Sequence, residues 1–486
     1  MTTHATFGLF TDLYQLTMAQ GYWKHGRADD EAVFHLGFRR APFEGGYAIA
    51  CGLAQVVELI AEFRYSPADC DYLASLTGND GRPLFEPGFL AWLEAMRPSV
   101  DVDAMPEGTA CFAHEPLVRV RGPLAQAQLL ETPLLTIVNF QTLIATKAAR
   151  ICDAARGEPV LEFGLRRAQG LDGGLSASRA AYVGGCVATS NVAAGARYQI
   201  PVKGTHAHAW VMAFASETEA FSAYAEAMPN NCVFLVDTYD TLRGVDRAID
   251  EARALRARGH ELAGIRLDSG DLAELSKAAR EKLDAAGFPN AAIVASNDLD
   301  EHQIRALEQA GAKISVWGVG TRLATAYDQP ALGGVYKLAA LRSDPSQPWR
   351  RMVKLSDTPI KTSIPGILQV RRYRKAGAPV LDVVYDVELG APQPGASASD
   401  IDPLSTASVT IPADCDEGED LLVPILRAGQ PVAEPEPTSA LRARTLAELA
   451  ALAPEVREPS GAARYPVALE PQVATLKREL IAAAKP

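Results

Sequence analysis

Short apolar runs recur through the middle of the chain, between about residue 158 and residue 320, and each run ends in a polar or glycine cluster. Continuous apolar runs of this length are typical of parallel strands that are buried on both faces. The strands predicted from these runs are Val160–Phe163, Val183–Ala188, a run at Val202, Val233–Val236, Ile265–Leu267, Ile293–Ala295 and Ile314–Trp317.

Amphipathic segments separate several of these runs and predict helices over Gly244–Arg258, Leu272–Ala285 and Glu301–Gln309. The polar clusters begin at Asp237, Asp268, Asn297 and Gly318, at spacings of 31, 29 and 21 residues. That spacing is typical of a βα unit. Polar groups at the carboxyl ends of successive parallel strands indicate an α/β barrel or an open doubly wound sheet. Seven strands in one series favour the barrel.

The two ends of the chain have a different pattern. Near the N-terminus, Thr11 or Asp12 is predicted to cap a helix with an apolar stripe. A strand is expected over Ala32–Phe38 and a helix over Gly52–Phe63. The last third predicts antiparallel strands, two linkers and two helices, in chain order Leu368–Tyr373, Val380–Leu389, Ala391–Pro403, Gln430–Ser439, Arg442–Leu452 and Gln472–Ala484.

Composition narrows the class of protein. A chain of 486 residues predicts two or three domains, and a hydrophobic fraction of 48% excludes a disordered chain. The formal net charge of −12 argues against nucleic acid and anionic membranes as partners. The seven cysteines form no CxxC pair, so we expect a reducing compartment. With no signal peptide or membrane span recognised, the predicted location is cytoplasmic.

Two short segments carry candidate chemistry. His206 and His208 would point to one face if their segment is extended, and they are either satisfied polar residues or a metal pair. A metal would need a third ligand, which Asp237 or Asp268 could supply. Arg266 and Asp268 also share a face, and they either pair with each other or bind an anion and hydroxyl groups or Mg²⁺.

Glycine and hydroxyl clusters indicate phosphate binding. The segments 296–298 (SND) and 318–321 (GVGT) are predicted to lie at the starts of helices, where backbone N–H groups bind anions. Arg166 and Arg167 add positive charge, and no Walker motif occurs. The residues alone therefore predict a cytosolic α/β barrel enzyme that acts on a phosphorylated anionic small molecule with Mg²⁺.

A series of motifs then resembles one family in its order. The motifs are TDLYQLTMAQGYW (11–23), LEFGLRRAQGLDGGLSASRAAYVGGCVATSN (161–191), GTHAHAW (204–210), VDTYDT (236–241), GIRLDSGDL (264–272), SND (296–298), GVGT (318–321) and GGVYKL (333–338). Together they resemble the nicotinate phosphoribosyltransferase family, over nearly the whole chain.

The resemblance implies an irregular α/β barrel joined to a smaller α/β (α+β) domain built from both chain ends. The expected divisions are 1–125, 126–335 (the barrel), 336–430 and a helical segment at 431–486. It also implies a homodimer with shared active sites. The implied reaction joins nicotinate to 5-phosphoribosyl 1-diphosphate, giving nicotinate mononucleotide and diphosphate, with Mg²⁺ and coupled ATP hydrolysis, in NAD salvage.

The resemblance also implies roles for individual residues. Tyr14, from the neighbouring subunit, and Phe163 would stack on the nicotinate ring, and His208 would be phosphorylated by ATP. Ser190, Thr205 and Arg266 would contact nicotinate, with Arg266 on its carboxylate. The phosphoribosyl diphosphate would be held by Arg166, Asp237 and Asp268, and its 5′-phosphate by Asn297, Asp298, Gly320 and Thr321.

Two departures and several alternatives remain at this point. Ala209 follows His208 where the family usually has serine, so a hydroxyl that could orient the imidazole is missing, and the loss could leave a non-catalytic binding protein. His206 is an additional histidine, and His208 is favoured as the phosphate acceptor.

A nicotinamide phosphoribosyltransferase would suit an acid where Ser190 stands, and a quinolinate enzyme would need a more basic pocket. A barrel lyase or aldolase would use Lys203.

Overall fold

The structure is a computed structural model that describes residues 6–484, and these divide into two compact units. Unit 1 contains the residues up to 143, residues 331–436 and the residues from 447 onward. Unit 2 contains residues 144–330 and 437–446. The protein is thus a mixed α/β protein in which both chain ends build unit 1. Unit 1 is the larger unit, so the expectation of a smaller domain from the chain ends is wrong.

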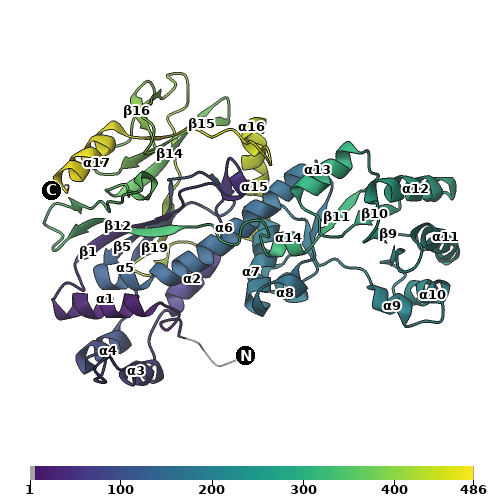
Figure 1. The fold of residues 1–486 in the computed structure, drawn as a ribbon, viewed down its shortest axis with the longest axis horizontal. Helices are drawn as coiled ribbons and strands as arrows, with labels where there is room; N and C mark the ends of the chain where they lie inside the picture. Colours follow the sequence, from purple (N-terminus) through teal and green to yellow (C-terminus); the bar gives the residue numbers. More distant parts are fainter. Residues whose placement is uncertain (1–5, 485–486) are drawn as a thin grey trace. The chain divides into compact units, whose positions relative to one another are not determined.

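A six-stranded parallel sheet forms the centre of unit 2, with the strand order β7-β6-β11-β10-β9-β8. Figure 1 labels β9, β10 and β11 of this sheet. Its strands are β6 (Val160–Glu162), β7 (Ala188–Thr189), β8 (Val233–Leu235), β9 (Gly264–Leu267), β10 (Ala292–Ala295) and β11 (Val316–Val319). The side chains of Phe234, Ile265, Ile293 and Trp317 are fully buried, as expected for strands covered on both faces. The predicted parallel sheet is confirmed.

Two of the predicted strands differ in the structure. Val183 ends a helix, and the strand is limited to Ala188–Thr189. The preceding residues SASRAAY are small or compatible with a helix, and the helix continues until Gly184 packs against the carbonyl oxygen of Ala145. Val202 forms only an isolated parallel bridge to Thr189.

Helices connect the strands of unit 2. They are η2 (Leu165–Arg167), α7 (Gly170–Val183), α8 (Val192–Tyr198), α9 (His208–Met212), α10 (Glu217–Ala227), α11 (Thr241–Ala257), α12 (Leu272–Ala285), α13 (Glu301–Gln309) and α14 (Thr321–Ala324). The side chains of Asp240, Asp271 and Asp300 cap α11, α12 and α13 by accepting backbone N–H groups. These caps fix the loops that follow β8, β9 and β10.

Unit 1 is built around two larger sheets and a two-stranded one. The antiparallel sheet β13-β12-β1-β5-β3-β19-β20 contains β1 (Glu31–Gly37), β3 (Asp101–Ala104), β5 (Pro116–Pro123), β12 (Val335–Arg342), β13 (Arg350–Arg351), β19 (Val423–Arg427) and β20 (Gln430–Pro431). The sheet β17-β16-β21-β15-β14-β18 contains β14 (Leu368–Lys375), β15 (Ala378–Asp386), β16 (Ser397–Asp400), β17 (Ser408–Thr410), β18 (Glu419–Asp420) and β21 (Val467–Leu469), and β2 (Ala48–Ile49) pairs with β4 (Ala110–Cys111). The segments predicted as linkers therefore contain β16 and β20.

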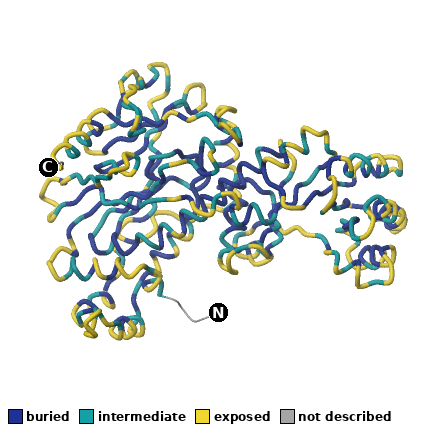
Figure 2. The backbone as a smooth tube through the Cα atoms, viewed as in Figure 1, coloured by how far each residue is buried: buried dark blue, intermediate teal, exposed yellow. Residues whose placement is uncertain are grey.

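The helices of unit 1 cover these sheets, and exposed residues lie along their outer faces (Figure 2). They are α1 (Leu13–Lys24), η1 (Pro42–Glu44), α2 (Leu53–Glu62), α3 (Pro67–Ala74), α4 (Pro87–Ala95), α5 (Leu124–Leu129), η3 (Pro359–Lys361), α16 (Pro454–Arg457) and α17 (Pro471–Ala483); α6 (Glu131–Ala154) and α15 (Thr438–Ala451) contain residues of both units. Asp12 precedes α1 without capping it by a side-chain hydrogen bond, because its carboxylate accepts from Thr132 Oγ1 at 2.9 Å. None of the helices within residues 6–484 has the length and apolar character needed to cross a membrane.

Candidate active site

A cavity of about 490 Å³ opens in unit 2 where the parallel strands end. It gathers predicted residues from the loops that follow five of the six strands, together with Thr205 and one strand residue, Arg266. Those residues are Phe163, Arg166, Ser190, Thr205, Arg266, Asp268, Asn297, Asp298, Gly320 and Thr321. Most of the polar clusters that the sequence placed at strand ends in this part of the chain therefore contribute residues to one cavity.

Arg266 places a largely desolvated guanidinium in this cavity. Its Nη1 donates a hydrogen bond to Thr205 Oγ1 at 2.5 Å, and its buried Nε has no hydrogen-bond partner among residues 6–484. Burial lowers the pKa of Arg266, although the carboxylates of Asp268 and Asp237 act in the opposite direction. A guanidinium that lines a cavity and keeps a donor without a partner is suited to binding a carboxylate.

Two carboxylates lie beside Arg266. Asp237 Oδ2 accepts from the backbone N–H of Asp268 at 3.1 Å and from Ser269 Oγ at 2.6 Å. Its other oxygen, Oδ1, is buried and lacks a hydrogen-bond donor in the described part of the chain. Asp268 accepts a hydrogen bond from Ser296 Oγ. A buried carboxylate oxygen without a hydrogen-bond donor lowers the free energy of unfolding. Asp237 Oδ1 is therefore suited to accept a hydrogen bond from a ligand hydroxyl or to contact a cation.

His208 faces both carboxylates from the start of α9. Its Nε2 lies 3.9 Å from Asp237 Oδ1 and 3.8 Å from Asp268 Oδ2, and 40% of its side chain is exposed. Its Nδ1 lies 3.1 Å from Thr238 Oγ1. Thr238 thus provides the orienting hydroxyl that Ala209 lacks. The sequence reasoning missed Thr238, although it directly follows Asp237 in a motif that had been singled out.

His206 lines the same cavity, but the residue is 8% exposed and its imidazole packs into the core of unit 2. Its Nε2 accepts the backbone N–H of Leu235 at 3.2 Å, and its ring packs edge-on against Tyr224 at a centroid distance of 4.8 Å. Burial lowers the pKa of His206 to about 4, so the ring is neutral. The expectation that both histidines point to one face is wrong, because the segment is not an extended strand and α9 begins at His208. Of the two alternatives considered from the sequence, a metal pair or polar residues with hydrogen-bond partners, the second is correct for His206.

Two loops at the far end of the cavity have unusual backbones. Asn297 and Asp298 both have positive φ, 108° and 44°, in the turn after β10. That turn does not start a helix, because α13 begins only at Glu301. The loop after β11 ends in α14, which is four residues long. The prediction that both segments lie at helix starts is therefore wrong for 296–298.

Phe163 and its neighbours define the opposite side. A Cβ on Gly318 would meet the Phe163 ring at 2.9 Å, so glycine is required there for the ring to lie against β11. Buried Glu162 accepts from Thr189 Oγ1 at 2.5 Å and from Ser178 Oγ at 2.9 Å. Glu162 ties the strands that carry Phe163 and Ser190 together, and nothing in the apolar pattern of the sequence distinguished it.

Tyr14 and Lys203 lie outside this cavity. Tyr14 belongs to α1 in unit 1 and is 49% exposed. Lys203, the lysine considered for a Schiff base, is exposed and does not line the cavity. Within residues 6–484, no group of three or more His, Cys, Asp or Glu side chains could by itself hold a metal ion.

Comparisons with known proteins identify the family of the chain. The chain matches three family profiles: nicotinate phosphoribosyltransferase N-terminal domain over 9–139, the nicotinate phosphoribosyltransferase family over 159–365, and the C-terminal domain over 369–477. Nicotinate phosphoribosyltransferase of Bacillus subtilis is 50% identical over 76% of this chain and 73% of its own length. The human one is 38% identical over 98% and 97%.

A crystal structure of human nicotinic acid phosphoribosyltransferase superposes with a TM-score of 0.83 and 35% identity, covering 97% of this chain and 99% of that one. A nicotinate-nucleotide pyrophosphorylase from Pyrococcus furiosus, at a TM-score of 0.69 and 21% identity over 91% and 94% of the two chains, shares the fold. On the family matches and these identities, the chain belongs to the nicotinate phosphoribosyltransferase family.

Proposed function

We propose that the protein is an enzyme that transfers the phosphoribosyl group of 5-phosphoribosyl 1-diphosphate to nicotinate. The products are nicotinate mononucleotide and diphosphate, ATP hydrolysis is coupled to the transfer, and the reaction serves NAD salvage. The observation that carries this proposal is the convergence of Arg266, Asp237, Asp268 and His208 on one edge of the parallel sheet. Two relatives named nicotinate phosphoribosyltransferase, which are 50% and 38% identical to this chain, support the proposal.

Nicotinate would bind with its carboxylate toward Arg266. The unused Nε and the Thr205-bound Nη1 present a planar donor face, and Ser190 adds a hydroxyl without negative charge. Phe163 would support one face of the pyridine ring, and Tyr14 of a second subunit the other. The ring nitrogen already has its lone pair, so orientation is what the site must supply.

The sugar and its phosphates would occupy the rest of the cavity. As the C1–O bond to diphosphate breaks and the C1–N bond forms, positive charge develops on the ribose near Asp237 and Asp268. Asp237 Oδ1 would accept a ribose hydroxyl or face Mg²⁺. Asp237 and Asp268 are the carboxylates of this site that would face Mg²⁺, which would supply positive charge to stabilise the diphosphate leaving group.

Basic and backbone groups would hold the two phosphate ends. Arg166 lines the cavity and would contact the diphosphate or the ring. Asn297, Asp298, Gly320 and Thr321 would surround the 5′-phosphate, because all four line the cavity and polar groups of two successive strand-end loops can bind an anion.

ATP would phosphorylate His208 at Nε2. The Thr238 hydroxyl fixes Nδ1, and Nε2 lies too far from both carboxylates for a hydrogen bond, so its lone pair is available. The bond between the γ-phosphorus of ATP and the β–γ bridging oxygen would break as the bond from phosphorus to this nitrogen forms, which releases ADP, and water would later cleave the N–P bond to give inorganic phosphate. A phosphate there would lie between Asp237 and Asp268, where its charge would change how the site holds diphosphate.

Two alternatives fit the site less well. A nicotinamide enzyme would gain from an acid near the ring amide, whereas Ser190 and Arg266 suit a carboxylate. A lyase that used Lys203 would need that amine in the cavity, and Lys203 is exposed outside it.

The dimer, the location and the closed barrel belong to the same proposal. Leu9, Phe10, Leu13, Tyr14 and Met18 are all exposed near the start of unit 1, which supports a second copy of the chain covering them. The bridge between Thr189 and Val202 continues the parallel pairing beyond β7, which supports an irregular barrel. The composition favours a cytoplasmic location.

The test is a product assay with purified full-length protein, nicotinate, 5-phosphoribosyl 1-diphosphate and Mg²⁺, with and without ATP. We expect nicotinate mononucleotide and diphosphate in both cases and more of each with ATP. With γ-labelled ATP, His208→Ala is expected to lose the protein-bound label. His206→Gln is the matched control, because glutamine can still accept the Leu235 N–H. Absence of the mononucleotide would refute the function, and label retained in His208→Ala would refute the acceptor alone.

A further inference from the structure

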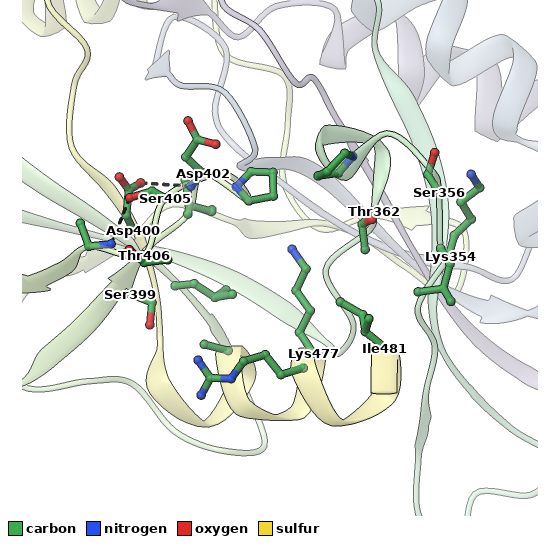
Figure 3. A pocket seen from close by; sticks show the side chains of 18 of the residues that line it. Lys354, Ser356, Thr362, Ser399, Asp400, Asp402, Ser405, Thr406, Lys477 and Ile481 are labelled. Carbon is green, nitrogen blue, oxygen red and sulfur yellow. Dashed lines mark hydrogen bonds between the residues drawn. The ribbon is translucent and has the colours of Figure 1, made fainter. Parts of the chain in front are cut away.

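A second cavity, of about 860 Å³, lies wholly within unit 1. Its walls come from the loop 354–362 after β13, from β16 with the segment 399–407, and from α17 (Figure 3). The volume is in the range of small-molecule sites. None of the residues assigned to the proposed reaction lines it.

Lys477 is the central feature of this cavity. Its side chain rises from α17 into the space between the other two walls (Figure 3). Within residues 6–484, the Lys477 ammonium forms no hydrogen bond or ion pair, and burial lowers its pKa. Because a partly desolvated ammonium without a counter-charge costs free energy, the cavity is arranged for an anion that enters from outside.

The neighbouring groups do not neutralise Lys477. Asp400 and Asp402 lie on the facing wall, where both pair with Arg464, at 2.6 and 3.4 Å, and neither forms an ion pair with the Lys477 ammonium. His114 is neutral, because burial and then the Lys477 charge lower its pKa to about 4. Asp357 is exposed on the loop side of the cavity, and among the described residues it forms no ion pair with Lys477.

The rest of the lining indicates the kind of anion. Lys354 adds a second cation from the opposite wall, and Thr362 and Thr406 supply hydroxyl groups. Leu355, Ile401 and Ile481 line the remaining surface with apolar groups. An ammonium with hydroxyl donors suits a phosphate group, and the apolar walls suit an organic body attached to it.

We propose that this cavity is a second ligand site, which binds the phosphate monoester of a small organic metabolite with its phosphate on Lys477. The site is independent of the transfer reaction proposed above, because its residues belong to unit 1 and the candidate active site belongs to unit 2.

The test uses full-length protein and two matched probes, AMP and adenosine, which differ by the phosphate. Acetylation of individual lysines is followed by mass spectrometry. AMP is expected to slow acetylation of Lys477 by about tenfold at saturation, as a charge-assisted contact would. Adenosine is expected to have no effect. Lys375, an exposed lysine of unit 1 paired with Asp414 at 2.6 Å, is the internal control and should react at a constant rate.

The same measurement is repeated in Arg266→Ala and in Arg166→Ala, which remove the arginines assigned above to the nicotinate carboxylate and to the diphosphate. Protection of Lys477 that persists there supports a separate site, and protection that disappears contradicts it. Equal protection by adenosine, or an unchanged rate at Lys477 with millimolar AMP, would also overturn the proposal. These readouts follow Lys477 in the folded wild-type protein or in either variant, so a failure of the phosphoribosyl transfer would leave them interpretable.

Discussion

At the scale of single residues, the site contains two buried polar atoms that have no hydrogen-bond partner among the described residues. These atoms are the buried Nε of Arg266 and the buried Oδ1 of Asp237. Burying these atoms without partners lowers the free energy of unfolding. A ligand that forms hydrogen bonds with them would recover that free energy on binding. The unpaired atoms therefore point to where the carboxylate and the ribose should lie.

Arg266→Ala is expected to raise the KM for nicotinate steeply, by an amount equivalent to roughly 2–4 kcal/mol, because a charge-assisted contact in a desolvated site is lost. The KM for 5-phosphoribosyl 1-diphosphate should change much less. Thr205→Val is the matched variant: it removes the hydroxyl that holds Nη1 but keeps the charge, so its effect should be smaller. Steady-state kinetics with each substrate varied would measure both, and an unchanged nicotinate KM in Arg266→Ala would remove Arg266 from the ring site.

The sequence predicted the residues of the site better than their surroundings. Arg266, Asp268 and Ser190 could be found because they stand at ends of apolar runs, and strand ends meet at one edge of a parallel sheet. Glu162 and Thr238 could not be distinguished, since their importance depends on contacts to residues that are distant in the sequence. The resemblance favoured His208 over His206, but only the structure shows that the His206 ring is buried whereas 40% of the His208 side chain is exposed.

At the scale of elements, the same reasoning succeeded where local pattern and tertiary environment agree. Helices α12 and α13 begin and end as predicted, because aspartate caps and amphipathic spacing both mark them. Val183 was assigned to a strand, but it ends α7, because an alanine-rich segment packed against α6 favours a helix more strongly than one valine disfavours it.

Two loops at the phosphate end are joined by an ion pair. Arg322 follows Thr321 in the loop after β11, and its Nη1 lies 3.0 Å from Asp300 Oδ2 in the loop after β10. Asp300 Oδ1 meanwhile caps α13 by accepting from His302 and Gln303. One side chain therefore holds both loops that would surround the 5′-phosphate.

Asp300→Asn separates the ion pair with Arg322 from the capping of α13, because asparagine retains the capping oxygen and loses the charge. We expect the KM for 5-phosphoribosyl 1-diphosphate to rise by about tenfold, or ~1.4 kcal/mol, with an unchanged nicotinate KM and an almost unchanged melting temperature. Arg322→Met should have the same effect, and the double variant should be no worse than either single one. Additive losses in the double variant would show that the ion pair does not position the loops.

At the scale of the whole molecule, each unit contains a buried neutral histidine that accepts a backbone N–H. In unit 1, His35 Nε2 accepts from Leu368 at 3.1 Å, and in unit 2 His206 Nε2 accepts from Leu235 at 3.2 Å. Burial lowers the pKa of His35 to about 3 and that of His206 to about 4. Between these values and the ordinary value near 6.5, the unfolded chain binds more protons than the folded one.

The stability that each histidine contributes is therefore complete above about pH 6.5 and decreases as the pH falls toward 4, on the order of 3 kcal/mol for His206. We expect the urea midpoint of each unit to fall over this range. His206→Gln should flatten the pH dependence of unit 2 alone, and His35→Gln that of unit 1 alone, because glutamine accepts the N–H without titrating. Equilibration in urea at each pH, followed by a hydrogen-exchange pulse at one fixed pH, would resolve the two units by mass spectrometry. A His206→Gln protein whose unit 2 kept the full pH dependence would show that acid acts there through other groups.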